Sequence, residues 1–307
     1  MKNTPRRLFT AVLALTTALI FFLPTGSFTA TANDRQAEKS IIVIGDVSSM
    51  FSGWEEIFEN DSGETLLVLS SPDMNSESAK ETARERIGIG STVFIALGTN
   101  DAMLGTGTYV KYERFKDNLR LIVDICRDAN AVPIIVTPPP IYDESFFGEE
   151  SGEEYGIYGG ANGFVTNYAC LAREAAREKC VCIADMNAAF WDVNFKNYIG
   201  GDGVTLNEKG AELYARTSLD AYRTATLGDP SFDGRVGATD YLLIKRSTLG
   251  TYEMTQAQTA RSDADGDGKI DAVDYLMVKR HVLDTYHIDR GEHSAEITYR
   301  ESVFQGT

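Results

Sequence analysis

Ile41-Ile-Val-Ile-Gly-Asp-Val-Ser48 joins four consecutive apolar residues to a short turn that begins Gly-Asp. A strand that is buried on both faces has this continuous apolar pattern, as in a parallel sheet covered by helices. Pro133-Ile-Ile-Val136 repeats the pattern further along the chain. We therefore expect a buried parallel sheet, with any ligand site at the edge where its strands end.

Between residues 39 and 225, short β-branched runs alternate with helical patterns. This alternation is typical of a three-layer, flavodoxin-like α/β domain with helices on both faces of a parallel sheet. The predicted strands are Ser40–Ile44, Thr65–Leu69, Thr92–Leu97, Val132–Val136 and Val181–Ala184. The predicted helices are Ser76–Ile87, Tyr109–Ala129, Phe164–Lys179 and Asn207–Thr224.

A segment that follows this domain is repeated 34 residues further along the chain. Asp229-Pro-Ser-Phe-Asp-Gly-Arg-Val-Gly-Ala-Thr-Asp240 aligns with Asp263-Ala-Asp-Gly-Asp-Gly-Lys-Ile-Asp-Ala-Val-Asp274. The match continues through Tyr241-Leu242 over Tyr275-Leu276. Because roughly half of the positions are identical, we interpret the two segments as an internal repeat.

Each copy carries oxygen-bearing residues at the spacing of a calcium-binding loop. Ca²⁺ takes about six to eight oxygens, from loop positions 1, 3, 5, 7, 9 and 12, with Gly at position 6. Gly237 at position 9 of the first copy has no side chain, so we expect water there and weaker binding. The predicted ligands are Asp229, Ser231, Asp233, the Arg235 carbonyl and Asp240 in the first copy, and Asp263, Asp265, Asp267, the Lys269 carbonyl, Asp271 and Asp274 in the second.

Each loop ends in Asp at position 12 and is followed by a short amphipathic helix with Lys-Arg at positions 17 and 18. This repeated loop-helix unit resembles the type I dockerin family over about residues 227–288. The resemblance implies a small all-α module with paired EF-hand-like loops, two calcium ions, and docking on a cohesin module of a scaffoldin in a cellulosome. The alternative for the Lys-Arg pairs is an ordinary solvated helix face. The cohesin-binding residues that the resemblance implies are Ala238, Thr239, Lys245 and Arg246, with Ala272, Val273, Lys279 and Arg280 as their counterparts.

The turns of the larger domain, taken in order, resemble those of the SGNH (GDSL-like) hydrolases, a family with many carbohydrate acetylesterases. The resemblance implies that Asn100 corresponds to an oxyanion-hole donor and Asp202 to the acidic catalytic residue. The chain departs from the family at the nucleophile, where it has Val47, and at the catalytic histidine, where it has Thr205. It also has Ser70-Ser71-Pro72 where the family places an oxyanion-hole glycine. The motifs that carry the resemblance are Gly45-Asp46-Val47-Ser48, Gly98-Thr99-Asn100-Asp101, Pro138-Pro139-Pro140 and 202–207.

The distribution of histidine also indicates that the larger domain lacks a serine-histidine mechanism, and this argument does not depend on the family resemblance. The three histidines are His281, His287 and His293, so residues 1–280 contain none. A serine nucleophile needs a base near neutral pH, and imidazole, with a pKa of about 6.5, is the usual one. A carboxylate such as Asp202, with a reference pKa of about 3.9, is a far weaker base. Ser48 remains the candidate for a substitute nucleophile, and hydrogen bonding within its own turn is the alternative role.

These observations favour a catalytically degenerate SGNH-like domain that binds plant cell-wall carbohydrate. Two alternatives remain open: an active carbohydrate esterase that uses a non-standard serine, and a purely structural subunit. The acidic, aromatic segment Tyr142–Gly160 could stack on sugar rings at a cleft rim, or could pack its aromatic side chains beneath itself.

The N-terminus predicts secretion. Lys2, Arg6 and Arg7 precede the apolar run Leu8–Leu23, and Ala30-Thr31-Ala32 offers a cleavage site, so residues 1–32 are the predicted signal peptide. The formal net charge of −16 makes nucleic acid and anionic membranes poor partners. The predicted mature chain has no membrane span and is divided into 33–226, 227–288 and a flexible tail, 289–307. For Cys126, Cys170, Cys180 and Cys182, both free thiols and one disulfide stay open.

Overall fold

The stretch that opens the sequence argument forms strand β1 (Ile41–Gly45), which lies next to the edge strand of a five-stranded sheet. The computed structural model describes residues 41–50, 53–147 and 153–292. The predicted signal peptide lies outside the described residues, as do residues 293–307 of the predicted tail. Among the described residues, no helix combines the length and the apolarity needed to cross a membrane.

All strand pairs in the sheet are parallel, and their order is β2-β1-β3-β4-β5. This is the doubly wound, flavodoxin-like order, so the predicted fold class is confirmed. The four other strands are β2 (Leu66–Val68), β3 (Thr92–Ala96), β4 (Val132–Val136) and β5 (Cys182–Ala184). Each of the five predicted strands corresponds to one of the five strands of the sheet, with boundaries that differ by one residue at most.

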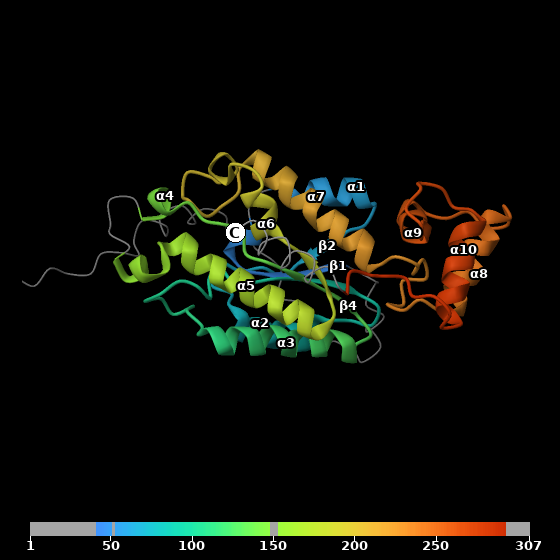
Figure 1. Cartoon of the computed structure of the whole chain (residues 1–307), viewed down its shortest axis with the longest axis horizontal. Coiled ribbons are helices and arrows are strands. Elements are labelled where there is room, and N and C mark those ends of the chain that lie inside the picture. Colours follow the sequence, from blue (N-terminus) through green and yellow to red (C-terminus); the bar gives the residue numbers. More distant parts are fainter. Residues whose placement is uncertain (1–40, 51–52, 148–152, 293–307) are drawn as a thin grey trace, which may run out of the picture. The chain divides into compact units, whose positions relative to one another are not determined.

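Helices cover both faces of the sheet (Figure 1). One face carries α2 (Ser76–Arg86), α3 (Tyr112–Asp128) and α5 (Ala161–Lys179). The other carries α1 (Trp54–Ser62), α6 (Met186–Trp191) and α7 (Glu208–Ala225). Shorter elements are η2 (Val47–Ser49), α4 (Asp143–Phe147), η3 (Glu153–Tyr158) and η4 (Phe195–Asn197).

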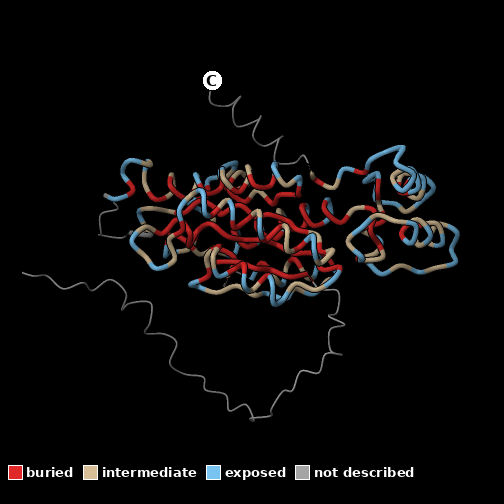
Figure 2. The backbone as a smooth tube through the Cα atoms, turned by 90° about the horizontal axis from the view of Figure 1, so that it is seen from below, coloured by how far each residue is buried: buried red, intermediate tan, exposed pale blue. Residues whose placement is uncertain are grey.

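Successive residues of the central strands face opposite layers of the core. Ile42 and Ile44 pack with the α2, α3 and α5 side, whereas Ile41 and Val43 pack with the α1 and α7 side. Both sets are buried, which accounts for the continuous apolar run in the sequence. Figure 2 shows the buried backbone concentrated in the sheet between two more exposed helical layers.

The sequence did not predict α1 or α6, and it placed the start of α3 three residues early. Lys111 has extended backbone dihedrals and is the N-cap of α3, which therefore begins at Tyr112 rather than Tyr109. The N-terminal residue of α1 is Trp54, whose indole Nε1 donates to the Ser49 carbonyl at 3.0 Å. This contact connects α1 to the turn after β1.

The start of α2 depends on a carboxylate from the turn after β3. Asp101 is buried, and its two oxygens accept from the Ser76 amide at 3.0 and 3.2 Å. Burial raises the pKa of Asp101 to about 7, and the charge of Asp46 adds to the shift. The carboxyl group therefore remains protonated in the folded state well above the pKa it has in an unfolded chain.

The repeated segment forms α8 (Ala238–Thr248), α9 (Gln256–Ser262) and α10 (Ala272–Val282). Ile244 of α8 and Val278 of α10 are fully buried and occupy equivalent positions in the two copies. The equivalent rings of Tyr241 and Tyr275 meet edge to face, with centroids 6.1 Å apart. The two copies therefore contact each other through equivalent residues, around a core of few apolar side chains.

The connection between the α/β domain and the repeat is short. Helix α7 ends at Ala225, and the first predicted calcium ligand is Asp229. At the start of the predicted tail, Arg290 Nε donates to the Ala225 carbonyl at 2.7 Å.

Cys126 is a buried free thiol, and Cys170 and Cys180 are exposed free thiols.

We expect Phe58→Ala to lower the unfolding free energy of the α/β domain by about 3–5 kcal/mol, because it empties a fully buried aromatic site. The Phe58 ring meets Trp54, Phe94 and Tyr222 edge to face. Urea denaturation followed by tryptophan fluorescence measures the loss. Glu56→Ala, an exposed change on the same helix, serves as the control. A loss below about 1 kcal/mol for Phe58→Ala contradicts this packing.

A second prediction concerns pH. The folded-state pKa of Asp101 exceeds the unfolded value of about 3.9. Its protonated carboxyl group therefore contributes fully to the unfolding free energy below about pH 3.9, and this contribution is lost as the pH rises through about 7. Asp101→Asn should therefore reduce the fall in unfolding free energy between pH 4.5 and 7.5 by up to about 1.4 kcal/mol per pH unit. Tryptophan-monitored urea unfolding across this range, at saturating calcium, measures the slope. Asp128→Asn, at an exposed site, should leave it unchanged.

Candidate functional site

The turn after β1 is organised around the carboxylate of Asp46, which is fully buried. Asp46 Oδ1 accepts from the amide and the hydroxyl of Ser48, at 3.0 and 2.7 Å. Asp46 Oδ2 accepts from the amides of Thr99 and Asn100, at 2.8 and 3.2 Å. Burial raises the pKa of Asp46, and these hydrogen bonds oppose the rise. The carboxylate therefore joins the turn after β1 to the turn after β3.

Neither serine of this turn has an uncommitted hydroxyl. Ser48 is buried and donates to Asp46. Ser49 donates to the Asp46 carbonyl at 2.9 Å, and its Oγ also lies 2.9 Å from Ser70 Oγ. Val47, at the position that corresponds to the family nucleophile, is partly buried and packs its side chain on an apolar cluster.

Asn100 lies in the turn after β3 and is almost fully buried. Its Nδ2 donates to the Pro72 and Met74 carbonyls, both at 2.7 Å. Both hydrogens of the side-chain amide are thus engaged by the segment after β2. In this arrangement Asn100 connects the end of β3 to the segment after β2. A substrate oxygen could accept a hydrogen bond from the Asn100 side-chain amide only by displacing one of these two bonds.

Asp202 and Thr205 hydrogen bond to each other in the turn before α7. Asp202 Oδ1 accepts from the amides of Val204 and Thr205, at 3.0 and 2.9 Å. The Thr205 hydroxyl lies 2.9 Å from each oxygen of the same carboxylate. Val204 belongs to the extended apolar cluster on which Val47 also packs. A hydroxyl therefore stands beside the acidic residue where the family resemblance implies an imidazole.

The aromatic segment packs largely on the domain's own core. Tyr155 is almost fully buried, and its hydroxyl accepts from the Leu104 amide at 2.8 Å. The rings of Tyr155 and Tyr158 lie 5.6 and 4.4 Å from that of Phe164. The side chains of Phe146 and Phe147 lie outside the described residues. Of the two sequence interpretations of this segment, these contacts favour self-packing.

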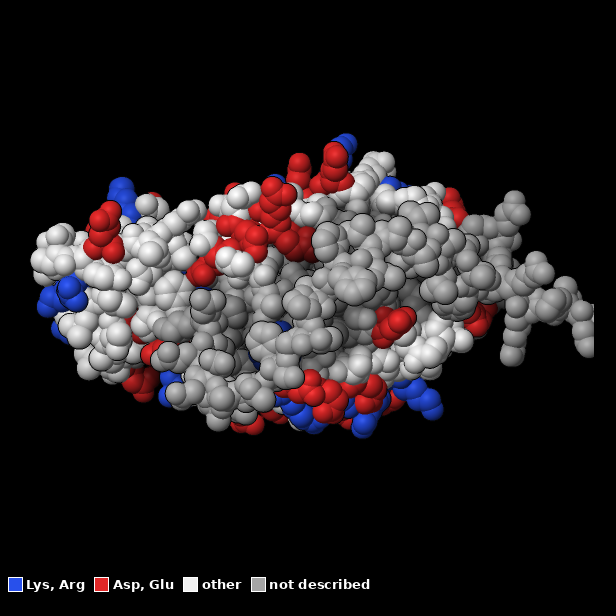
Figure 3. All heavy atoms as spheres, turned by 180° about the vertical axis from the view of Figure 1, so that it is seen from behind, with Lys and Arg blue, Asp and Glu red and all other residues white. Residues whose placement is uncertain are grey.

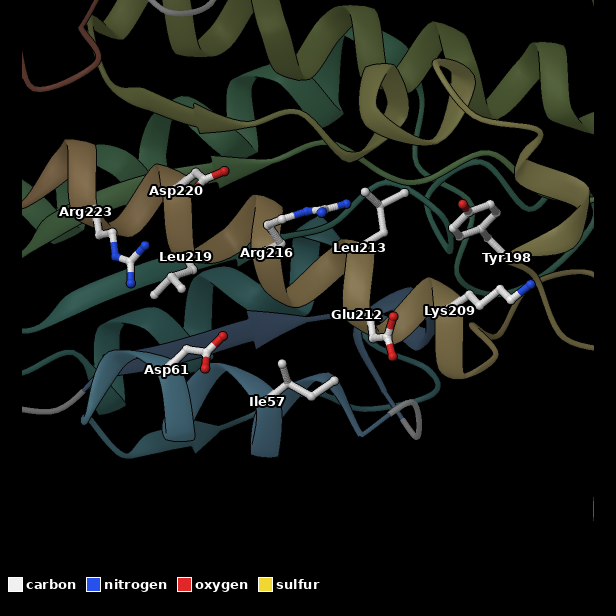
Figure 4. A pocket seen from close by; sticks show the side chains of 10 residues that line it. All are labelled: Ile57, Asp61, Tyr198, Lys209, Glu212, Leu213, Arg216, Leu219, Asp220 and Arg223. Atoms are coloured by element: carbon white, nitrogen blue, oxygen red, sulfur yellow. The ribbon is translucent and has the colours of Figure 1, made fainter.

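A groove of about 640 Å³ lies elsewhere, between α1 and α7 (Figure 4). Ile57 and Asp61 line it from α1, and Arg216 and Asp220 are among the residues that line it from α7. Its lining mixes acidic, basic and apolar side chains, and none of the strand-end residues that the sequence selected belongs to it. Figure 3 shows another face of the molecule on which Asp and Glu side chains gather in groups.

The first predicted calcium loop brings three carboxylates together. Oxygens of Asp229, Asp233 and Asp240 lie within 4.8 Å of one another. The loop turns at Gly234, at position 6, with φ of 83°, and the Gly234 amide donates to Asp229 Oδ2 at 2.9 Å. Burial raises the pKa of Asp229 to about 6, against the opposing charge of Arg261. Ser231 Oγ lies 3.3 Å from Asp229 Oδ1, so it too is in the loop interior.

The second loop repeats this geometry. Its turn is Gly268, with φ of 81°, and the Gly268 amide donates to Asp263 Oδ2 at 2.9 Å. Oxygens of Asp263, Asp265 and Asp267 lie within 4.8 Å of one another. Asp263 Oδ1 is buried and accepts no hydrogen bond from the described residues. A buried carboxylate oxygen of this kind, among further carboxylates, fits a divalent cation with oxygen ligands.

The residues at position 12, Asp240 and Asp274, brace the loops from inside. Each accepts from the amide at position 9, at 2.8 Å in both copies. Asp271, at position 9, accepts from the Val273 amide at 2.7 Å and is the N-cap of α10. The predicted ligands Asp271 and Asp274 therefore lie outside the closely grouped set of the second loop.

The residues implied in cohesin binding are accessible in both copies. Ala238, Thr239 and Arg246 are exposed, and Lys245 is partly exposed with its Nζ 5.5 Å from the centre of the Tyr241 ring. The four counterparts on α10, Ala272, Val273, Lys279 and Arg280, are exposed. Leu242 and Leu276 add exposed apolar side chains at equivalent positions of the two helices.

Sequence reasoning missed one buried charged residue beside the first loop. Arg261 of α9 lies 3.6 Å from Asp229 Oδ2 and donates to the hydroxyl of Tyr222 at 2.8 Å. One feature of the sequence could have indicated the special role of Arg261: the equivalent position in the first copy of the repeat is occupied by Leu227. An arginine that replaces an apolar residue at one of two equivalent positions marks a local difference in environment.

Comparison with known proteins identifies the C-terminal module. Residues 227–283 match the family model described as the dockerin type I domain. Type I dockerin domains are calcium binders, which agrees with the predicted cofactor. No match was found among curated proteins.

Solved structures similar to the chain cover its larger domain. They include a lipase/acylhydrolase from Enterococcus faecalis, with 17% identity, 59% of this chain and 94% of that chain covered, and a TM-score of 0.46. They also include a catalytic mutant of an acetylxylan esterase from Geobacillus stearothermophilus, with 16% identity, coverage of 60% and 93%, and a TM-score of 0.45. A GDSL-like lipase from Bacteroides thetaiotaomicron gives 16% identity, coverage of 61% and 89%, and a TM-score of 0.48.

At this level of likeness, neither reaction nor substrate passes from those proteins to this chain. The register of the two loops, the paired helices and the family match together identify residues 227–283 as a type I dockerin domain, the module that docks on a cohesin in a cellulosome.

Proposed function

We propose that the protein is a secreted cellulosome subunit whose dockerin holds two calcium ions and docks on a scaffoldin cohesin. We further propose that its α/β domain is an SGNH-like domain without hydrolase activity. The observation that carries the second proposal is the pair Val47 and Thr205 at the positions of the family nucleophile and base. The absence of histidine from residues 1–280 supports it, since imidazole is the usual base for a serine.

The contacts of the strand-end residues also support a non-catalytic domain. Asn100 uses its side-chain amide on the Pro72 and Met74 carbonyls, and Asp202 accepts from Thr205. Both are engaged in holding turns together rather than in presenting donors or a base to a substrate. The ligand that we propose for the α/β domain is plant cell-wall carbohydrate, acetylated or not.

A second candidate function, an esterase with a non-standard serine, is favoured by one contact. Ser48 Oγ lies 2.7 Å from Asp46 Oδ1, and burial raises the pKa of that carboxyl, which makes its ionised form a stronger base. The 3% exposure of Ser48 counts against it, because a nucleophile has to reach the substrate. The third candidate, a purely structural subunit, differs from the first in having no polysaccharide ligand.

Ester hydrolysis by the secreted chain, lacking residues 1–32, tests the proposal. We expect no measurable activity on aryl acetate or on acetylated xylan and pectin, because the chain lacks the serine-histidine pair. We expect Val47→Ser combined with Thr205→His to gain activity, since it restores both groups at the positions that the family resemblance assigns. Thr205→His alone is the matched control.

Wild-type activity that Ser48→Ala abolishes would establish the esterase and end the non-catalytic proposal. Affinity electrophoresis of the same chain in xylan and pectin gels separates the first candidate from the third. Retardation by a polysaccharide supports a binding domain, and unchanged mobility in every gel supports a structural subunit.

Calcium binding has its own prediction. Isothermal titration calorimetry should give two ions per chain, with the first loop weaker because it has fewer carboxylates. Asp265→Asn replaces one charged ligand of the second loop with a neutral oxygen ligand and should lower the tighter affinity, whereas Asp284→Asn, outside both loops, should change neither. Chelation with EGTA should abolish the tyrosine near-ultraviolet dichroism of the dockerin, because its core is small and metal binding contributes to folding. A dichroism signal insensitive to EGTA would falsify this.

A further inference from the structure

Arg261 connects the first calcium loop to the α/β domain. It is 3% exposed, and its guanidinium lies 3.6 Å from the Asp229 carboxylate on one side. On the other side, Nη2 and Nε donate to the Tyr222 hydroxyl, at 2.8 and 3.2 Å. Tyr222 belongs to α7, and its hydroxyl in turn donates to Glu64 Oε1 at 3.1 Å. A continuous polar chain therefore leads from loop position 1 into the α/β core.

The two copies of the repeat differ at the residues that make this connection. The counterpart of Arg261 in the first copy is Leu227, which packs on the dockerin's own apolar core. The dockerin core therefore accommodates an apolar residue at this position, whereas the arginine contacts a different domain.

A second difference lies in the loop itself. Phe232, at position 4, has a φ of 59°, in the left-handed region that favours glycine, and its counterpart in the second loop is Gly266. The Phe232 ring lies under the Arg261 guanidinium, with 4.2 Å between the guanidinium carbon and the ring centre. A phenylalanine in a conformation suited to glycine costs backbone energy. The stacking of the Phe232 ring with Arg261 offsets this cost in the first loop, and the second loop has no such contact at Gly266 because glycine has no side chain.

The backbone of the α/β domain also approaches the first loop closely. A Cβ built on Gly90, just before β3, would lie 2.6 Å from the Phe232 carbonyl oxygen. Arg235, at position 7, donates to the side chain of Asn130, just before β4. Arg290 bridges the Ala225 and Gly234 carbonyls, at 2.7 and 3.3 Å. In the second loop, a Cβ built on Gly266 or on Gly268, at positions 4 and 6, would meet no atom of the described residues within 4 Å.

We propose that the first calcium loop is an interdomain joint. Calcium bound there stabilises the α/β domain through Arg261 and Tyr222, whereas calcium in the second loop acts within the dockerin alone. The inference rests on calcium binding by the first loop. Binding measured by calorimetry therefore distinguishes a failure of that premise from a failure of the coupling.

The two tryptophans make the coupling measurable in the full secreted chain. Trp54 and Trp191 both lie in the α/β domain, so their fluorescence follows that domain and not the dockerin. We expect saturating calcium to raise the urea midpoint of the tryptophan transition by on the order of 1 M, relative to EGTA. An unchanged midpoint overturns the proposal.

Matched loop variants identify which ion is responsible. Asp233→Asn and Asp267→Asn change position 5 of the first and the second loop, and each lowers calcium binding at its own site. We expect the first to reduce the calcium-dependent shift at a fixed calcium concentration and the second to retain it in full. Retention in Asp233→Asn, or equal loss in both, contradicts the assignment to the first loop.

The connection itself is tested by Arg261→Leu, which installs the residue of the equivalent position, and by Tyr222→Phe, which removes only the hydroxyl. Both should bind calcium in calorimetry, and both should lose most of the midpoint shift. A full shift in both variants overturns the role given to Arg261.

Discussion

The α/β domain depends on one buried carboxylate, that of Asp46. Its oxygens accept four hydrogen bonds: two from Ser48 close the turn after β1, and two from the Thr99 and Asn100 amides join that turn to the turn after β3. The side chain of Asn100 extends the connection to the segment after β2. A buried charge of this kind is tolerated only with several donors around it, so the surrounding backbone is fixed by what the carboxylate requires. The turns after β1 and β3 both contribute donors that satisfy that requirement.

The buried carboxylates of the dockerin also need partners, and the two loops provide them in different ways. In the second loop, Asp263 retains an oxygen that no described residue satisfies, which leaves it for a cation. In the first, the corresponding Asp229 lies against the guanidinium of Arg261. One repeat thus presents two carboxylate clusters of similar design, one more isolated and one joined to a neighbouring domain.

The sequence predicted the sheet well because its strands are buried on both faces and are therefore uniformly apolar, as in Ile41–Ile44 and Ile134–Val136. The calcium loops were predictable because ligand spacing is local and the repeat sets its register. What could not be predicted depends on tertiary contacts. Helix α1 is short and is positioned by Trp54, and the side-chain amide of Asn100 is engaged by distant carbonyls. Arg261 required knowledge of which face of α9 meets Tyr222.

The short connection between α7 and the first loop has a consequence for a protein that docks on a scaffold. Three residues separate Ala225 from Asp229, and an extended chain of that length reaches roughly 10 Å. A long flexible tether lets a domain sweep a large volume and dilutes it over that space. Here the α/β domain stays close to its point of attachment. Its local concentration near the scaffold surface is therefore high, and the volume that it can reach from one docking position is small.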